Sequence, residues 1–292
     1  LRLLGLYQAL GDKSQTREIG TFDWPGEKFR RHSLSATLEE IDVPLSAEHH
    51  QAASDAANRA GGRVVIDMLF SQQASLSPEY IAEVVATIRW ADVVVFSHPW
   101  VAPLIEKDLL IGKTVVYDSH NVELNLRTQL LGNSQPFERE ILAEVKRSER
   151  LAGDLADLIL ACSEEDIDGF MELYGWPRTK MLVVPNGVFA SHIKPPTAEE
   201  KNASRNQLQV GEERFVAFFI GSDYAPNIEA AEIIIREISP TLPEVEFVIA
   251  GGVCTRLNFE NYSNVRLVGF VEDQQKLRWL HAADFALNPM CS

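Results

Sequence analysis

Polar residues, two of them histidines, come directly after four β-strands that the sequence predicts. The four segments are residues 97–100 (SHPW), residues 118–121 (DSHN), Ser163 and residues 185–187 (PNG). In an open parallel sheet, ligands bind outside the carboxyl ends of the strands. We therefore expect these segments to border one crevice, which is the predicted functional site.

The two histidines differ as candidates for chemistry. A single histidine after a strand is more often a capping or packed residue than a catalytic one, and this is the simpler interpretation of His98. His120 stands between Asp118 and Asn121 at the end of a predicted strand, where both ring nitrogens can meet a ligand or a neighbouring side chain. His120 is therefore the stronger candidate.

The last third of the sequence predicts a site for a phosphate group. Gly221 and Ser222 follow a predicted strand, and Pro226 is a suitable first residue for the helix that comes next. Glycine lets a ligand approach the backbone closely, and the free N–H groups at a helix start bind anions. Residues 221–226 are thus expected to hold a phosphate.

Two further glycine-containing segments follow strands in the same part of the chain. They are residues 251–252 (GG) and residues 269–271 (GFV). Either they let the main chain approach a base or a ribose, or they are only tight turns that need a positive φ.

Motifs of several other enzyme classes are absent from the sequence. It has no G-x-G-x-x-G, Walker or protein-kinase pattern, which argues against a dinucleotide dehydrogenase or a P-loop enzyme. It also has no G-x-S-x-G or H-E-x-x-H pattern, so neither a serine hydrolase nor a zinc protease is indicated. Asp166 and Asp168 form a D-x-D pattern, but it falls inside a predicted helix, so we expect no metal site there.

Short apolar runs alternate with helical patterns along the chain, which is typical of β-α-β units and a parallel sheet. In the first part, strands are predicted at residues 18–22, 64–68, 93–96, 114–117, 158–162 and 181–184. Helices are predicted at residues 136–151 and 163–174, the second with Ser163 at its start and Gly175 at its end. These elements predict a doubly wound α/β domain.

A stretch rich in proline and charge, residues 193–202, fits a linker with a short helix. The alternation then restarts, with strands at residues 215–220, 245–250, 265–268 and 285–287 and helices at 226–238 and 273–283. The sequence therefore predicts a Rossmann-like domain at residues 1–190, a linker at 191–211 and a second Rossmann-like domain at 212–292.

Composition and charge exclude several classes of protein. Of 292 residues, 46% are hydrophobic and 24% are charged, which are ordinary proportions for globular domains. No stretch approaches the roughly 20 apolar residues that cross a bilayer, and the start lacks a secretory signal pattern, so we expect a cytoplasmic protein with at most peripheral membrane contact. The net charge of −15 repels nucleic acid, which is not an expected partner.

The cysteines (Cys162, Cys254 and Cys291) are too widely spaced to indicate a disulfide framework or a zinc knuckle.

Both ends of the sequence are expected to fall inside a domain. Residue 1 is Leu, and residues 1–11 have helical spacing up to Gly11. The chain stops five residues after the strand predicted at 285–287, with no helix to cover it. We expect the first strand of the first domain and the rest of the second domain to lie outside this sequence.

Taken together in their order and spacing, seven motifs resemble those of the retaining, GT-B-type glycosyltransferases of family four, the group-one glycosyltransferases, over nearly the whole chain. The motifs are YDSHNVE at 117–123, ADL at 156–158 with CSEED at 162–166, VPNGV at 184–188, FIGS at 219–222 with PN at 226–227, IAGG at 249–252, VGFVED at 268–273 and ADFALNPM at 283–290.

The resemblance implies two Rossmann-like domains that face each other across a crevice, with the acceptor on the first, the nucleotide-sugar donor on the second and no metal or other cofactor. It places the family's catalytic histidine on His120 and the acceptor side at His98 and Asn121. The donor-binding residues that it implies are Gly221, Ser222, Asn227, Gly251, Phe270, Val271, Asn288 and Pro289.

Three departures from the family pattern bear on the donor site. Residues 221–235 contain neither the arginine nor the lysine that usually neutralises the pyrophosphate. The pair of glutamates eight residues apart is expected beyond Ser292, and the glycine-rich loop after the first strand is expected before Leu1. The 292-residue polypeptide alone is therefore expected to transfer no sugar.

The sequence thus predicts a retaining transferase of hexosyl type that moves a sugar from a UDP- or GDP-sugar to an acceptor hydroxyl on a sugar, a lipid-linked molecule or another compound. Its expected role is the biosynthesis of cell-surface polysaccharide or glycoconjugate. Two alternatives remain open: a nucleotide-sugar epimerase of the same fold, and a non-catalytic two-domain protein that binds a ligand.

Overall fold

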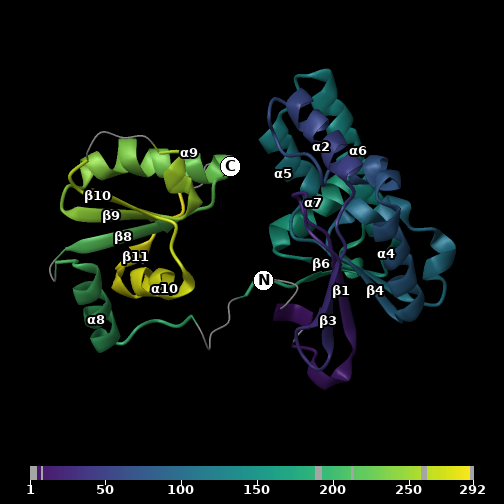
Figure 1. The fold of residues 1–292 in the computed structure, drawn as a ribbon, viewed down its shortest axis with the longest axis horizontal. Coiled ribbons are helices and arrows are strands. Elements are labelled where there is room, and N and C mark those ends of the chain that lie inside the picture. The colour runs from purple at the N-terminus through teal and green to yellow at the C-terminus, as the bar shows by residue number, and fades with distance from the viewer. Residues whose placement is uncertain (1–4, 8, 188–192, 212–213, 258–261, 290–292) are drawn as a thin grey trace. The chain divides into compact units, whose positions relative to one another are not determined.

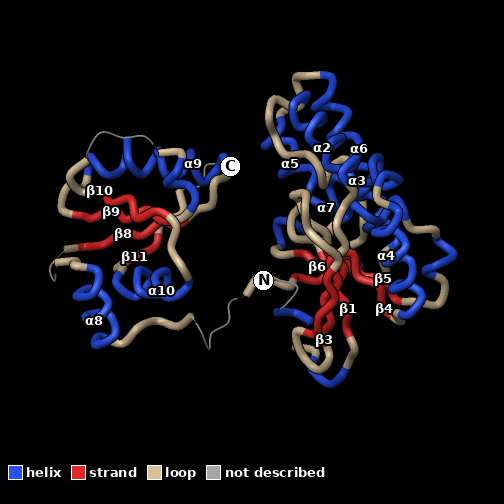
Figure 2. Tube along the Cα trace, in the orientation of Figure 1, coloured by secondary structure: helices blue, strands red, loops and turns tan. Residues whose placement is uncertain are grey.

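The structure is a computed structural model that describes residues 5–7, 9–187, 193–211, 214–257 and 262–289. The chain divides into two compact units, Leu1–Val188 and Phe189–Ser292. Both units consist of helices packed on β-sheets, as Figures 1 and 2 show.

The first unit contains a four-stranded parallel sheet in the order β4-β5-β6-β7. Its strands are β4 (Val93–Phe96), β5 (Thr114–Asp118), β6 (Leu158–Ala161) and β7 (Met181–Val183). The sequence predicted each of these strands to within a residue at either end. Because all four run in the same direction, their carboxyl ends lie along one edge of the sheet.

A second, three-stranded sheet in this unit was largely missed by the sequence prediction. It consists of β1 (Thr16–Gly20), which is parallel to β3 (Leu38–Asp42), and β2 (Arg30–Ser33), which is antiparallel to β3. The strand predicted at residues 18–22 is β1, shifted by two residues. The strands of the first unit therefore form two separate sheets.

The strand predicted at residues 64–68 is wrong. The segment is a loop followed by a turn, in which the Leu69 N–H donates to the Val65 carbonyl at 3.1 Å. Val65, Ile66 and Met68 are buried in the core of the first unit, so the apolar run reports burial and not a strand. A short apolar run has this ambiguity because periodicity alone does not distinguish a buried strand from another buried segment.

The helices of the first unit contribute to one core with the four-stranded sheet. They are α2 (Ala47–Arg59), α3 (Phe70–Gln73), α4 (Pro78–Trp90), α5 (Glu123–Leu131), α6 (Pro136–Leu155) and α7 (Glu164–Tyr174). The predicted cap of α7 is confirmed, because the Ser163 hydroxyl accepts from the Asp166 N–H at 3.1 Å and Gly175 ends the helix at a φ of 71°. The helix α6 runs four residues beyond its predicted end. Of the helix expected at residues 1–11, residues 5–7 are helical, and residues 1–4 and 8 lie outside the described residues.

The second unit contains a parallel sheet in the order β10-β9-β8-β11. Its strands are β8 (Phe215–Ile220), β9 (Val245–Ala250), β10 (Val265–Gly269) and β11 (Phe285–Ala286), all close to the predicted positions. Its helices are α8 (Ala198–Leu208), α9 (Ala225–Ile233), which continues as a π-helical turn through Ile238, and α10 (Asp273–Ala282).

Alternate residues of β8 and β9 pack against opposite layers of this unit. Ala217 and Phe219 lie in a core with residues of α9, whereas Val216 and Phe218 lie in a core with Trp279 of α10. Figure 1 shows the corresponding arrangement, with α9 on one side of the sheet and α8 and α10 on the other. This period of two, with both faces buried, is what a central parallel strand requires.

The helix in the predicted linker packs within the second unit. Arg205 of α8 forms an ion pair with Asp284 at 2.6 Å, and its guanidinium also donates to the carbonyls of Ala282 and Arg214. Lys201 contacts the same carboxylate at 2.6 Å. These contacts tie α8 to the start of β11.

Among the helices that the structure describes, none has the length and apolar character of a membrane span.

Candidate functional site

The two candidate histidines lie side by side in the first unit. His98 follows β4 and His120 follows β5, and their ring centroids are 4.5 Å apart at an interplanar angle of 53°. The neighbouring strands β4 and β5 pair in register, Phe96 with Tyr117, so the two loops leave the sheet at the same level. The His98 side chain is 45% exposed, which leaves part of the pair open to a ligand.

The loop that carries His120 is fixed to the neighbouring strand. The Ser119 N–H donates to the Leu160 carbonyl at 2.8 Å, and the Cys162 thiol lies 3.4 Å from the His120 carbonyl. The Ser119 hydroxyl donates to the Asn121 carbonyl at 2.5 Å, which closes the turn before α5. These contacts hold the backbone around His120 at the carboxyl edge of the sheet.

Glu123, the first residue of α5, is a site residue that the sequence analysis did not single out. Its carboxylate is 3.8 Å from the His98 Nδ1 atom, which is ion-pair range, and 2.9 Å from the Arg127 Nε atom. Burial acts to raise the pKa of Glu123, but His98 and Arg127 together outweigh it and hold the pKa below its ordinary value. Glu123 therefore carries a negative charge behind the histidine pair.

Arg127 connects this charge to further groups. Its guanidinium pairs with Asp67 at 2.7 Å and lies over the Trp100 ring at 5.4 Å from the ring centroid. Burial raises the pKa of Asp67, with Arg127 acting in the opposite direction. The polar residues at this edge thus form a connected group.

Asn121, from the same segment as His120, and two other predicted segments also lie at the carboxyl edge of this sheet. Asn121 is exposed next to His120, residues 185–187 are exposed after β7, and Ser163 caps α7 after β6. Ser163 caps α7, and this structural role by itself explains a serine at that position.

In the second unit, Gly221, Ser222 and Asn227 come together at the carboxyl end of β8. The Asn227 side-chain amide donates to the Ser222 hydroxyl at 3.1 Å and contacts its carbonyl at 3.3 Å. A β-carbon on Gly221 would lie 2.9 Å from the β-carbon of Asn227, so only glycine fits between the strand and the start of α9. The loop is therefore drawn tightly over the N-terminus of α9.

Gly251 packs against the same loop from the end of β9. Its φ is 95°, and a β-carbon there would lie 2.2 Å from the Gly221 carbonyl oxygen. The Val253 N–H donates to that oxygen at 3.1 Å. The glycines after the two central strands thus position each other, and they bring the backbone after β9 beside the predicted phosphate loop.

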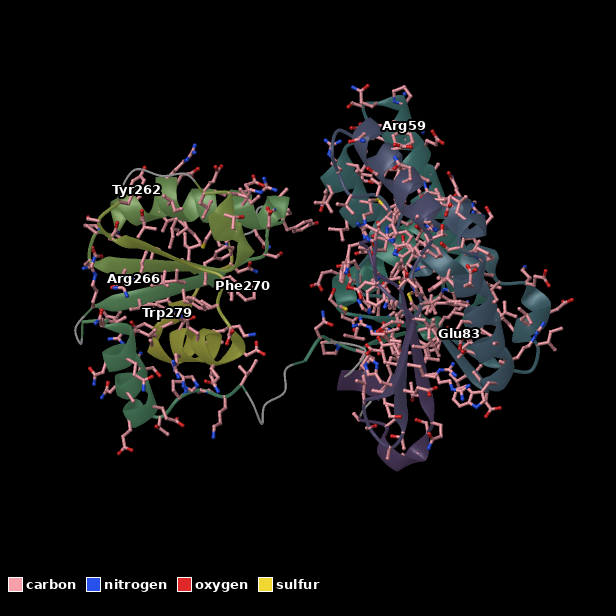
Figure 3. The ribbon with its side chains drawn as sticks, in the orientation of Figure 1. Arg59, Glu83, Tyr262, Arg266, Phe270 and Trp279 are labelled. Atoms are coloured by element: carbon pink, nitrogen blue, oxygen red, sulfur yellow. The ribbon has the colours of Figure 1, made fainter. Side chains whose placement is uncertain are left out.

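Phe270 and Val271 follow β10 and differ in exposure. The Phe270 side chain is 82% exposed at the end of the strand, where Figure 3 labels it, whereas Val271 is buried in the core between the sheet and α10. Only Phe270 offers its side chain to a ligand. Asn288 and Pro289 follow β11 at the same edge of the sheet, and Asn288 is exposed.

Arg256 and Asp223 form an ion pair beside the phosphate loop, which the sequence analysis did not anticipate. The Arg256 Nε atom lies 2.9 Å and 3.0 Å from the two carboxylate oxygens of Asp223. Asp223 comes directly after Ser222, and Arg256 ends the short helical turn after β9. The structure therefore brings a guanidinium from elsewhere in the chain to the loop that lacks a basic residue of its own.

One group of potential metal ligands is found among the described residues. Ligand atoms of His32, Glu40 and Asp42 lie within 4.8 Å of one another on β2 and β3. His32 contacts Glu40 at 2.7 Å and Arg30 contacts Asp42 at 3.4 Å, so these side chains already pair across the strands. The D-x-D residues Asp166 and Asp168 lie within α7, as the sequence predicted.

Comparison with known proteins shows similarity at the level of structure. No protein-family model and no curated protein sequence matches the chain. The structure of WaaG, a glycosyltransferase involved in lipopolysaccharide biosynthesis, is similar with a TM-score of 0.59 and 17% identity, over 100% of this chain and 70% of that one. The catalytic domain of starch synthase IV from Arabidopsis thaliana, bound to ADP and acarbose, matches with a TM-score of 0.58 and 14% identity, over 99% and 74%. Alr3699/HepE from Anabaena in complex with UDP matches with a TM-score of 0.54 and 16% identity, over 93% and 73%.

These similarities establish the fold. The chain is an α/β protein of the GT-B type, with a Rossmann-like arrangement of helices and parallel strands, as the sequence predicted. At 14–17% identity, the comparisons define this fold and leave the activity to be argued from the site.

Proposed function

We propose that this chain is a glycosyltransferase that moves a sugar from a nucleoside diphosphate sugar to an acceptor hydroxyl. The observation that carries the proposal is the histidine pair, His98 and His120, at the carboxyl edge of a parallel sheet in a chain of GT-B fold. The similar structures include complexes with UDP, with UDP-glucose and with ADP, which supports a nucleotide sugar as the donor.

In this proposal the loop after β8 holds the diphosphate of the donor. The free N–H groups at the start of α9 and the Ser222 hydroxyl donate hydrogen bonds, and Arg256 supplies the positive charge. The bond from the anomeric carbon to the phosphate oxygen breaks while the bond to the acceptor oxygen forms, and the proton of the acceptor hydroxyl passes to the departing diphosphate. Negative charge grows on the departing diphosphate, so donors that are fixed in place there lower the barrier.

His120 is the group proposed to contact the transferred sugar. An imidazole at a defined strand end can accept or donate one hydrogen bond to a sugar hydroxyl and so orient the ring. His98 and Asn121 lie beside it and are assigned to the acceptor side. The same proposal includes retention of the anomeric configuration, hexosyl specificity and membership of family four. It also includes independence from metal and a division into domains at 1–190, 191–211 and 212–292.

Phe270 is proposed to lie along the base of the donor, because an exposed aromatic ring at a strand end offers a stacking surface. The proposed donor site is completed by the backbone of Gly251 and Val271 and by the residues Asn288 and Pro289. The acceptor is proposed to be a sugar, a lipid-linked molecule or another hydroxyl compound in polysaccharide or glycoconjugate synthesis, in the cytoplasm.

The proposal is tested by incubating the full-length protein with UDP- and GDP-sugars and a panel of hydroxyl acceptors. The expected result is a glycosylated product by mass spectrometry and an equal amount of released nucleoside diphosphate. The anomeric proton coupling of the product reports retention or inversion. Conversion of the donor to an isomeric sugar without an acceptor would instead show an epimerase, and binding of the nucleotide sugar with no turnover would show a binding protein.

A further inference from the structure

A buried carboxylate lies directly behind the candidate site, on a helix that contributes nothing else to it. Glu149 belongs to α6, and its side chain is 0% exposed. It accepts hydrogen bonds from the backbone N–H groups of Glu123 at 2.6 Å and Leu124 at 3.1 Å. The hydroxyls of Tyr174 at 2.6 Å and Tyr117 at 3.4 Å also donate to it. Four donors from three other elements therefore converge on one side chain.

The two backbone contacts make Glu149 the cap of another helix. The first N–H groups of a helix have no partner within it, and a side chain of the residue before the helix usually accepts from them. The residue before α5 is Val122, which has no acceptor in its side chain. Glu149 supplies the missing acceptor from 26 residues away in the sequence. A carboxylate at this end also interacts favourably with the helix dipole.

The start of α5 is also where Glu123 contacts the histidine pair. The Glu123 carboxylate is 1% exposed and lies 3.8 Å from the His98 Nδ1 atom. The His98 ring in turn lies 4.5 Å from the His120 ring, measured between centroids. Glu149 holds the backbone of Glu123, and so a connected series of contacts runs from the core of the first unit to the two rings.

We propose that Glu149 is a positioning residue for the histidine pair: it holds the start of α5, and with it Glu123, in the place that orients His98 against His120. The inference rests on the proposed function only for its effect on turnover, because the position of the rings is measurable without any substrate. Glu149 itself lies too deep in the core to touch a sugar.

The substitution Glu149→Gln separates this role from simple packing. The amide has nearly the same volume, but its NH₂ group cannot accept, so the backbone N–H of Glu123 or of Leu124 now faces another donor, while the tyrosine hydroxyl on the same side can turn and accept. We expect the start of α5 to move and Glu123 to move with it. A displacement of about 1 Å at a reacting group can lower turnover about 100-fold.

A matched control is available five residues away on the same helix. Glu144 is also a buried carboxylate of α6, but it contacts the side chains of Ser71, Gln72, Arg147 and Ser148, not the start of α5. Glu144→Gln makes the same chemical change in the same helix. It is expected to affect stability and to leave the two rings where they are.

The test is a set of imidazole NMR spectra of the full-length protein at a pH above 7, where Glu149 is ionised, with His98→Gln and His120→Gln used to assign the signals. Glu149→Gln should shift the ring signals of His98 and His120, and Glu144→Gln should leave them in place. Where transfer is measurable, Glu149→Gln should lower kcat about 10- to 100-fold with little change in KM for the donor.

Unchanged ring signals in a folded Glu149→Gln variant would overturn the inference. If that variant does not fold, Tyr174→Phe removes one of the four donors and should shift the same signals to a smaller extent, and the absence of any shift would overturn it equally. If the wild-type protein transfers no sugar but the ring signals respond, the proposed function fails while the positioning role of Glu149 stands.

Discussion

The rings of His98 and His120 lie 4.5 Å apart between centroids, although they come from the loops of two different strands. Adjacent parallel strands end at the same edge, so their loops bring together residues that are distant in sequence. Next to His98, Glu123 supplies a negative charge, because His98 and Arg127 hold the pKa of its carboxyl group below the ordinary value. An imidazole near a buried carboxylate has a preferred orientation, which is useful to a group that must place a sugar.

Replacement of the first candidate, His120→Ala, is expected to lower kcat about 100-fold or more in the full-length protein without unfolding it. The reason is the loss of a contact to the transferred sugar at the carboxyl edge of the sheet. Steady-state kinetics and circular dichroism provide the measurement. His50→Ala, on α2 of the same unit, is the control and should keep its activity. A His120→Ala enzyme with nearly normal kcat would contradict the role.

Substitutions of the Arg256 and Asp223 pair should change UDP affinity in opposite directions. Arg256→Gln removes the positive charge beside the phosphate loop and should weaken UDP binding about tenfold. Asp223→Asn removes a negative charge that competes with the diphosphate for Arg256, and should leave binding equal or up to about fivefold tighter. Isothermal titration calorimetry measures both.

Arg236→Gln breaks another exposed ion pair of the same unit, with Glu232, and serves as the control for these two variants. Its UDP affinity should match that of the wild type. If Arg256→Gln also binds UDP normally, another group neutralises the diphosphate.

Full-length transferase activity should persist in excess EDTA. The Asp166 and Asp168 pair lies within α7, and the metal-ligand group of His32, Glu40 and Asp42 lies on β2 and β3 and is already paired. The measurement is the initial rate before and after dialysis against the chelator. A rate that falls and returns with Mn²⁺ or Mg²⁺ would contradict the prediction, and His32→Ala would then show whether this group binds the ion.

The sequence was a good guide to the second unit and to the strand-end residues, because both depend on local patterns. The strands β8 and β9 are apolar runs that are buried on both faces, and the polar residues after β5 stand out against the strand before them. The strand β2 carries no such pattern. Its four residues are all exposed, and its side chains form ion pairs with β3 and with α4.

The residues that sequence reasoning missed act across long separations in the chain. Glu149 meets the start of α5 from 26 residues away, and Arg256 meets Asp223 from 33 residues away. Neither has a spacing that marks it. The only related observation was the lack of a basic residue at 221–235, and the sequence alone does not show which residue would supply the charge.

Stability of the first unit should depend on pH through Glu149. Burial raises the pKa of Glu149 from 4.5 to about 7, with Glu123 adding to the effect and the donors from Tyr174 and two backbone N–H groups opposing it. Between these two values Glu149 binds more protons in the folded state than in the unfolded state, so its contribution to stability falls as the pH rises from about 4.5 to about 7. The full difference in this contribution is about 3 kcal/mol. Burial lowers the pKa of His49 from 6.5 to about 4, which contributes a slope of the opposite sign.

Chemical denaturation of the wild type and of Glu149→Gln at several pH values measures this contribution as the difference between two slopes, and the variant should lose less stability, or gain more, as the pH rises through this range. In Glu144→Gln the slope between pH 4.5 and 7 should remain, because the pKa of Glu144 lies below its ordinary value and its contribution is lost only at lower pH. Equal slopes in the wild type and in Glu149→Gln would show that Glu149 is charged throughout this range.

The substitution Gly251→Ala should destabilise the second unit and weaken nucleotide binding together. Gly251 has a φ of 95°, which costs an L-residue about 1–3 kcal/mol, and an added β-carbon would lie 2.2 Å from the Gly221 carbonyl oxygen. The atom that it meets is backbone, so relief requires the loops after β8 and β9 to separate, and these are the loops proposed to hold the diphosphate.

Thermal unfolding and UDP titration provide the measurements. Gly211→Ala is the control, because a β-carbon there would meet only the Arg214 side chain at 3.9 Å and no strained φ is involved. A Gly251→Ala protein that is destabilised but binds UDP as well as the wild type would separate this loop contact from the donor site.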